Sequence, residues 1–471
     1  MSSMDWSTVL GVTKGRWAVL PRSNQLPPVG VAIDTRELHR GQTFVAYVGQ
    51  RVDGHAYLNQ ARDLRAAMCI VTDATKIPEG FDVPTLVVDD ATDALTAMAM
   101  HWRSQMQGTV IGVTGSNGKT TTTRLIHAVL NNGGKAWVSS KSHNNAIGVP
   151  MSVLNAPLDA EHAIFELGTS SPGEIAQRAQ LVLPDIGVIT SIGRAHLEEL
   201  GSIEGVCSEK ASMLGHVKNH AIVPDGVLDE AIRLLAPGCT IERVGQQHLS
   251  SIKIDERSVS FEFGGHPFTV PVPGVHNASN AAMAVLVGRA CGMDDPNIAA
   301  GLLSARLPEM RLSRIEIPTK SDPIVIYNDA YNANPDSTRA ALTFFEGLRT
   351  DANKVVVLGD MLELGSAGER EHDLLIDDLE GITLGGGRIV LVGPMYAKAV
   401  LGGGDRFESY PVTDDHAMTE IARTINLGDV VLIKGSRGVG LERLVYILIN
   451  RHTPYAKSGQ SQSPAEGTNT P

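Results

Sequence analysis

The sequence predicts an α/β protein built of three domains. Short apolar, β-branched runs recur along the chain, and stretches with helical spacing separate them. Such alternation favours parallel, doubly wound sheets, in which ligands bind beyond the carboxyl ends of the strands. Several of the runs end in clusters of polar residues, and a chain of 471 residues is too long for a single hydrophobic core.

Residues 1–107 are expected to form a small α/β domain. Strands are predicted at 29–34, 43–48, 67–72 and 85–88, with a helix at 56–64. Thr35 and Arg36 follow the first strand, where the Arg36 guanidinium could hold a phosphate-bearing ligand through two parallel hydrogen bonds. The alternative, which the spacing alone favours, is a surface salt bridge between Arg36 and Asp34.

The predicted central domain, residues 108–312, opens with a phosphate-binding loop. A buried strand is predicted at 110–114 and a helix at 120–130. Between them, G-S-N-G-K-T gives a tight turn whose backbone N–H groups can bind an anion at the helix N-terminus. Lys119 can reach the β- and γ-phosphates, and the Thr120 hydroxyl can bind Mg²⁺. The loop residues expected to contact the nucleotide are Gly115, Ser116, Asn117, Gly118, Lys119, Thr120 and Thr121.

An ordinary glycine-rich turn with a solvated lysine is the alternative for this loop. The strict eight-residue phosphate-loop pattern requires a glycine where Val113 stands, so only the shorter G-x-x-G-K-T remains. The strand before the loop and the helix after it favour the phosphate-binding interpretation.

Two further strands of the central domain, expected at 163–167 and 186–190, place candidate metal ligands near their ends. Glu166 closes the first strand and His196 follows the second. A carboxylate and an imidazole suit a divalent cation such as Mg²⁺, although His196 taken alone is better explained by local hydrogen bonds. Lys210 lies in an expected helix among charged neighbours, and this pattern is typical of a solvated lysine.

The central domain is expected to end in a β meander at 251–272 and a long Ala-rich helix. Asn277 has the side chain of an N-cap for this helix. His276 and Asn280 lie one turn apart on one face, where they could bracket a planar base or simply cap and pack.

Residues 313–454 are predicted to form a second doubly wound domain. Its strands are expected at 324–328, 354–358, 388–392 and 430–433. Three of them end in polar motifs, N-D-A-Y-N-A-N-P-D-S, G-D-M-L-E-L-G and K-G-S-R-G, which are expected to form one wall of an active site. Residues 455–471 have little apolar surface to bury and are expected to be disordered.

Composition narrows the classes of partner. The net charge of −12 makes nucleic acid an unfavourable main partner. No apolar run approaches the length of a membrane span, and the first residues lack the pattern of a signal peptide. The four cysteines are far apart and lack metal-ligand spacing. We therefore expect a cytoplasmic protein with reduced thiols.

Taken together, the motifs resemble one family, the Mur ligases. The resemblance rests on G-S-N-G-K-T-T, S-H-N-N-A-I-G-V-P, E-L-G, A-H-L-E, H-N-A-S-N-A and the three motifs of the last domain. It covers nearly the whole chain except the tail. Within the family the pattern is closest to the members that add a dipeptide, and residues 33–55 resemble the nucleotide-sugar domain of those members.

The resemblance implies an ATP-dependent ligase of three domains. Its expected substrates are ATP, a UDP-muramoyl tripeptide and D-alanyl-D-alanine, and its expected cofactors are two Mg²⁺ ions. A monomer is expected. The alternatives are a sister ligase that adds a single amino acid and a non-catalytic, nucleotide-binding homologue. A phosphate-loop GTPase is a further alternative, but the chain lacks the Asn-Lys-x-Asp element that specifies guanine.

The resemblance also assigns roles to single residues. Thr120 and Glu166 would contact one Mg²⁺, while Glu166 and His196 would serve the second. Lys210 matches a lysine that family members carbamylate, which would give the second metal a carboxylate-like ligand. Lys119, Lys210, His196 and Arg311 are the expected catalytic residues. His276 and Asn280 would face the adenine, Arg311 the γ-phosphate and Asp329 the ribose. The expected substrate-binding residues are Thr35, Arg36, Asn144, Asn145, Asn332, Asn334, Lys434, Ser436 and Arg437.

The chain departs from the usual family pattern at three places. Ser191 stands where an Asn is common, and Ala211-Ser212 follow Lys210 in place of Gly-Glu. Met310 precedes Arg311 where a Gly is more usual. None of these changes removes a group that the chemistry requires.

Overall fold

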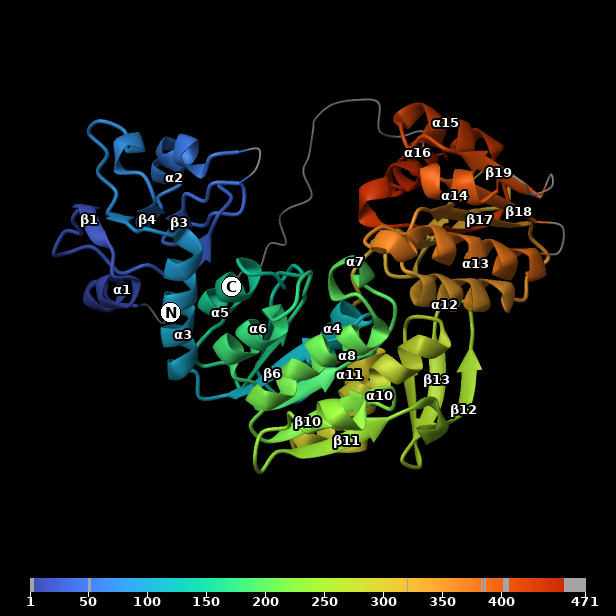
Figure 1. The fold of residues 1–471 in the computed structure, drawn as a ribbon, viewed down its shortest axis with the longest axis horizontal. Helices are drawn as coiled ribbons and strands as arrows, with labels where there is room; N and C mark the ends of the chain where they lie inside the picture. The colour runs from blue at the N-terminus through green and yellow to red at the C-terminus, as the bar shows by residue number, and fades with distance from the viewer. Residues whose placement is uncertain are drawn as a thin grey trace. The chain divides into compact units, whose positions relative to one another are not determined.

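The computed structural model describes residues 4–49, 52–319, 321–382, 384, 387–400 and 406–452. The chain divides into two compact units, Met1–Leu307 and Pro308–Pro471, each with its own sheets (Figure 1). The tail predicted at 455–471 lies outside the described residues. Among the described helices, none has the length and apolar character needed to cross a membrane.

The first unit begins with a five-stranded sheet of order β1-β5-β4-β3-β2, in which only β1 is antiparallel to its neighbour. Its strands are β1 (Arg16–Val19), β2 (Val31–Ala32), β3 (Thr43–Val45), β4 (Met68–Val71) and β5 (Thr85–Val87). Its helices and 3₁₀ turns are α1 (Trp6–Thr13), η1 (Gly54–Tyr57), α2 (Leu58–Asp63), η2 (Ala74–Lys76) and α3 (Ala91–Gln105).

Strand β2 is shorter than the run predicted at 29–34. The chain turns after it, because the Glu37 N–H donates to the Asp34 carbonyl and the Arg36 N–H donates to the Asp34 carboxylate. β2 is an edge strand, and the side-chain amide of Asn155 covers its outer side. That amide accepts from the Val31 N–H at 3.1 Å and donates to the Val31 carbonyl at 3.0 Å.

The second sheet of this unit has six parallel strands in the order β11-β10-β9-β6-β8-β7. Its strands are β6 (Thr109–Thr114), β7 (Ala136–Val138), β8 (His162–Glu166), β9 (Ile186–Ile189), β10 (His220–Pro224) and β11 (Thr240–Val244). An antiparallel meander, β12 (Leu249–Ile254), β13 (Val259–Phe263) and β14 (His266–Val270), follows as predicted.

Helices cover both faces of the six-stranded sheet, which confirms the doubly wound prediction. Val110 belongs to the core cluster that also holds buried residues of α3, α5 (Gly148–Asn155) and α6 (Glu174–Val182). Its neighbour Ile111 belongs to a second cluster, with buried residues of α4 (Lys119–Gly133), α10 (Val275–Ala290) and α11 (Asp295–Leu303). The remaining short elements are α7 (Leu197–Leu200), α8 (Ile203–Ala211), η3 (Ser212–His216), α9 (Asp229–Ile232) and η4 (Gln246–His248).

The second unit holds a six-stranded sheet of order β15-β16-β20-β17-β18-β19, parallel except for β15. Helices α12 and α13 lie on one face and α15 and α16 on the other (Figure 1). The strands are β15 (Ser313–Ile317), β16 (Ile324–Asp329), β17 (Lys354–Gly359), β18 (Arg388–Val392), β19 (Phe407–Tyr410) and β20 (Val430–Lys434). The helices and turns are α12 (Pro335–Glu346), η5 (Gly365–Ala367), α13 (Gly368–Gly381), α14 (Pro394–Ala399), α15 (Asp415–Thr424), η6 (Arg437–Val439) and α16 (Glu442–His452).

Candidate active site

The predicted phosphate loop joins β6 to α4. Gly115 and Gly118 have φ angles of 146° and 81°, a region that favours glycine. A Cβ at Gly115 would overlap Thr190, and one at Gly118 would overlap the Asn280 side chain. Both glycines are therefore required by backbone conformation and by close neighbours, and the first turn of α4 presents its N–H groups to this loop.

The segment after β9 holds the phosphate loop in place. The Ser116 N–H donates to the Ser191 carbonyl at 2.9 Å, and the Asn117 N–H donates to the Ser191 hydroxyl at 2.8 Å. The Ser116 hydroxyl donates to the Gly193 carbonyl at 3.0 Å. Ser191, which departs from the usual Asn, thus keeps a polar side-chain contact with the loop.

Lys119 folds back over the loop that it follows. Its ammonium donates to the Gly115 carbonyl at 2.7 Å and to the Ser116 carbonyl at 3.3 Å. A phosphate bound at the loop would therefore meet both the α4 N-terminus and this charge.

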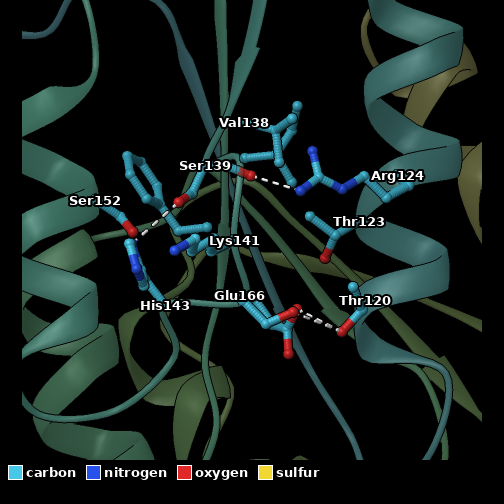
Figure 2. A pocket seen from close by; sticks show the side chains of 12 residues that line it. Thr120, Thr123, Arg124, Val138, Ser139, Lys141, His143, Ser152 and Glu166 are labelled. Atoms are coloured by element: carbon cyan, nitrogen blue, oxygen red, sulfur yellow. Dashed lines mark hydrogen bonds between the residues drawn. The ribbon is translucent and has the colours of Figure 1, made fainter. Parts of the chain in front are cut away.

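Thr120 and Glu166 face one another from α4 and the end of β8 (Figure 2). The Thr120 hydroxyl donates to Oε2 of Glu166 at 2.8 Å, and the Asn144 amide donates to Oε1 at 2.7 Å. Glu166 is only 8% exposed. A hydroxyl and a buried carboxylate side by side form a pair of hard oxygen ligands, so these residues fit the Mg²⁺ site that the sequence predicts.

A pocket opens beside this pair, between α4, β7, β8 and the segment 139–143 (Figure 2). Arg124 crosses its upper part and donates to the carbonyls of Ser139 and Ser140 at 2.7 and 2.8 Å. The lining residues are Thr120, Thr123, Arg124, Val138, Ser139, Lys141, Ser142, His143, Ser152, Ile164, Phe165 and Glu166. Asn145 lies beyond them at the start of α5, where its side chain accepts from the Gly148 N–H at 2.8 Å.

Lys210 is not the solvated lysine that its sequence pattern suggests, because it is 1% exposed. Burial, and then the nearby charge of Lys119, lower the pKa of Lys210 to about 7. His196 precedes α7 with a φ angle of 56°. Across the described part of the chain, no three His, Cys, Asp or Glu side chains gather as a metal site.

The second turn of α10 lies against the phosphate loop. Asn280 contacts Gly118, and its amide donates to the Asn277 side chain at 3.1 Å. The prediction that Asn277 caps this helix is wrong. The helix starts earlier, at Val275 after Gly274, and the Asn277 amide instead donates to the Pro273 carbonyl at 2.7 Å. His276 lies in the first turn of α10, one turn before Asn280.

Thr35 and Arg36 lie in the turn after β2. The Thr35 hydroxyl is buried and donates to the Gln60 side chain at 2.9 Å. The exposed Arg36 guanidinium donates through Nε to both oxygens of Asp34 at 3.0 Å. This hydrogen bond holds the pKa of Asp34 below its usual value. The surface pair considered above is therefore present, and a ligand contact by Arg36 stays a prediction.

In the second unit, β16, β20 and β17 are neighbours. The three polar motifs that follow these strands therefore meet at the carboxyl ends of the strands, as predicted. The Lys434 ammonium lies 2.6 Å from Oδ2 of Asp329 and donates to the Asn332 carbonyl at 3.0 Å. The Ser436 hydroxyl accepts from the Leu362 N–H at 2.9 Å and donates to the Ala333 carbonyl at 3.2 Å. These bonds join the three motifs directly.

Asn334 and Arg437, the other two predicted dipeptide residues, also have partners within the unit. Asn334 caps α12, where its side chain accepts from the Ser337 N–H at 2.9 Å. Arg437 contacts the Met310 sulfur at 3.2 Å and lies 3.4 Å from Glu442. The substrate roles of both residues stay predictions.

Glu209 and Glu174 are structural parts of the site that sequence reasoning missed. Glu209 is 7% exposed and accepts from the N–H groups of Gly173 and Ile175 at 2.6 and 2.8 Å, so it caps α6. Glu174 accepts from the Ser170 N–H at 2.7 Å and pairs with Arg178 at 2.9 Å. Together they fix the segment after Glu166. The sequence points to these two residues only in one respect, which is that Glu209 directly precedes the predicted site residue Lys210.

Known proteins match this chain along most of its length. The Mur ligase middle domain matches residues 113–288, and the Mur ligase glutamate ligase domain matches residues 313–437. The curated UDP-N-acetylmuramoyl-tripeptide–D-alanyl-D-alanine ligase of Bacillus subtilis (strain 168) is 35% identical over 450 residues, which cover 91% of this chain and 95% of the relative.

Solved structures agree. MurF from Acinetobacter baumannii superposes with a TM-score of 0.81 at 29% identity and covers 95% of this chain and 99% of its own. The MurF ligase of Thermotoga maritima, in complex with ADP, has a TM-score of 0.73 at 26% identity, with 91% and 98% covered. This chain belongs to the Mur ligase family. The similarity also confirms the predicted fold class.

Proposed function

We propose that this chain is an ATP-dependent ligase that joins D-alanyl-D-alanine to UDP-N-acetylmuramoyl-tripeptide in the synthesis of a peptidoglycan precursor. One observation carries the proposal. A phosphate loop with Lys119 folded over it and a Thr120–Glu166 pair beside it lies in a chain that is similar, over more than nine tenths of its length, to ligases named for this reaction.

The reaction needs ATP because an amide does not form from a free carboxylate in water. The terminal carboxylate of the tripeptide attacks the γ-phosphorus of ATP, which gives an acyl phosphate and ADP. The amine of the dipeptide then attacks the acyl carbon, and phosphate leaves. In such transfers the protein contributes mainly positioning and charge neutralisation.

Residues of the first unit would supply both the positioning and the charge neutralisation. Gly115 to Thr121 hold the phosphates, and Lys119 offsets their charge. Thr120 and Glu166 would hold a Mg²⁺ ion, which when bound supplies further positive charge. Asn280 and His276 would face the adenine.

A second Mg²⁺ would be held by Glu166, His196 and a carbamylated Lys210. The burial of Lys210 supports this assignment, because a carbamate replaces a buried positive charge with the anion that a metal prefers. The remaining assignments follow the resemblance. Arg311 and Asp329 would contact the γ-phosphate and the ribose of ATP. Thr35, Arg36, Asn144 and Asn145 would bind the UDP-muramoyl tripeptide, and Asn332, Asn334, Lys434, Ser436 and Arg437 the dipeptide.

We also propose a monomer that works in the cytoplasm, with domains at 1–107, 108–312 and 313–454. Size-exclusion chromatography with light scattering tests the oligomeric state directly.

Phosphate release from ATP tests the function. It is measured with UDP-muramoyl tripeptide, with and without D-alanyl-D-alanine, and with single amino acids in place of the dipeptide. Turnover that requires both the nucleotide and the dipeptide is expected. Turnover with a single amino acid but not with the dipeptide would assign the chain to a sister activity, and no turnover with any acceptor would contradict a ligase.

A further inference from the structure

Arg311 lies in a segment with an unusual backbone. Met310 and Leu312, on either side of it, have φ angles of 60° and 57°. Residues other than glycine rarely adopt this left-handed region, because the Cβ comes too close to the carbonyl oxygen. Such a conformation persists only when the surrounding structure holds it.

Hydrogen bonds to the end of β16 hold this segment. The Leu312 N–H donates to Oδ1 of Asp329 at 3.0 Å, and the Tyr331 N–H donates to the Met310 carbonyl at 3.2 Å. The Leu312 side chain is 2% exposed. The backbone on both sides of Arg311 is therefore fixed to the turn that carries Tyr331.

Tyr331 also contacts the Arg311 side chain. The guanidinium carbon lies 4.0 Å from the centre of the Tyr331 ring, a distance at which the ring face attracts the cation. The ring face carries partial negative charge, so the contact attracts the cationic end of the Arg311 side chain and restricts its orientation. A planar guanidinium whose orientation is already restricted loses less conformational freedom when it binds an oxyanion.

We propose that Tyr331 is a positioning residue for Arg311, whose guanidinium its ring holds in the orientation that binds a phosphate oxygen during ligation. This inference rests on the proposed function, in which Arg311 contacts the γ-phosphate. The backbone of residues 310–312 fixes the position from which the Arg311 side chain extends, and the Tyr331 ring fixes the orientation of the guanidinium plane.

The test measures kcat and KM for Tyr331→Phe and Tyr331→Leu in phosphate release with all three substrates. Tyr331→Phe keeps the ring and should keep kcat within about twofold. Tyr331→Leu should lower kcat about tenfold, with little change in the KM for D-alanyl-D-alanine. Both variants keep the backbone bond to Met310. Tyr446→Leu is the matched control, because Tyr446 is 70% exposed on α16 and should tolerate the change.

A second pair of variants separates positioning from a general structural role. In an Arg311→Lys background the compact ammonium has no plane to orient, so adding Tyr331→Leu should change kcat by less than about twofold. A loss that is as large in the Arg311→Lys background as in the wild-type chain, or an equal loss in Tyr331→Phe, would overturn the inference and leave the proposed function intact. A wild-type chain without turnover would overturn the proposed function, and the inference with it.

Discussion

The Lys434 ammonium lies 2.6 Å from Oδ2 of Asp329, and this ion pair joins two strand ends that are 105 residues apart in the sequence. The Lys434 side chain is 2% exposed and that of Asp329 is 19% exposed, so little water screens the pair. The other oxygen of Asp329 accepts from the Leu312 N–H. The pair thus links two motifs of the proposed site to the segment that carries Arg311.

Lys434→Met should destabilise the chain by about 3 kcal/mol, because it leaves the Asp329 carboxylate without its buried counter-charge. The free energy of unfolding in urea, measured for the variant and for the wild type, gives this loss. The double variant Lys434→Met/Asp329→Asn should recover much of the stability but none of the activity. A double variant that is less stable than the single one would contradict the pairing argument.

Lys119→Ala should abolish ADP release and leave binding of the UDP-muramoyl tripeptide within about twofold of wild type. The reason is that the ammonium lies over the phosphate loop, whereas Thr35 and Arg36, two of the residues proposed to bind this substrate, lie in the turn after β2. Calorimetry with the nucleotide and an ADP-release assay measure the two effects. Lys253→Ala, at an exposed lysine of β12, is the control. Loss of both properties together would show that the assigned domain roles are wrong.

Glu166→Gln should raise the Mg²⁺ concentration needed for half-maximal turnover by about tenfold or more, because an amide is a weaker ligand than a carboxylate. The amide oxygen can still accept from the Thr120 hydroxyl, and the Asn144 amide can turn its oxygen towards the new NH₂ group, so the local fold should remain. Titration of phosphate release with Mg²⁺ gives the value, and Glu262→Gln on the exposed side of β13 should leave it unchanged. An unchanged Mg²⁺ requirement in Glu166→Gln would place the metal elsewhere.

Carbamylation of Lys210 should be visible directly. With ¹³C-labelled bicarbonate, the wild type should give a carbamate carbonyl resonance that Lys210→Met lacks. Removal of dissolved CO₂ should lower turnover, and its return should restore it. Full activity in CO₂-free buffer would rule out this modification as part of the reaction.

Glu174 should make stability depend on pH. Burial opposes its ionisation, but hydrogen bonds from the Ser170 N–H and the Arg178 guanidinium outweigh burial and lower its pKa from 4.5 to about 2. A lowered acid pKa stabilises the fold above the unfolded value, and this contribution is lost as the pH falls from about 4.5 towards 2.

Glu174→Gln should therefore cost on the order of 2 kcal/mol at pH 7 and clearly less near pH 3. Urea unfolding of the variant and the wild type at both pH values gives the two differences. Glu230→Gln, at an exposed position of α9, is the control and should change stability little. A cost for Glu174→Gln that is the same at both pH values would show that the carboxylate charge is not what stabilises this turn.

The phosphate loop could be predicted from the sequence, because its residues are contiguous in the chain. The strand, loop and helix around Lys119 follow one another without interruption, so periodicity and two glycines were sufficient to find them. The polar ends of β16, β17 and β20 could also be placed at one edge, because parallel strands end on the same side of a sheet.

Contacts between distant segments were not predictable in this way. Ser191 meets Asn117 across 74 residues, and no spacing rule connects them. The charged neighbours of Lys210, taken alone, predict a solvated lysine, yet tertiary packing buries it. The antiparallel strand β15 was missed, and the cap of α10 was misplaced because Gly274, with a φ angle of 101°, starts the helix earlier.

The side-chain amide of Asn155 covers the outer edge of strand β2 in the first sheet. By pairing with both backbone groups of Val31, it occupies the outer side of β2 as the backbone of another strand would. An exposed edge of this kind is where a second chain can add its own strand and begin to aggregate. A single side chain from α5 therefore takes up the Val31 backbone groups to which such an added strand would bind.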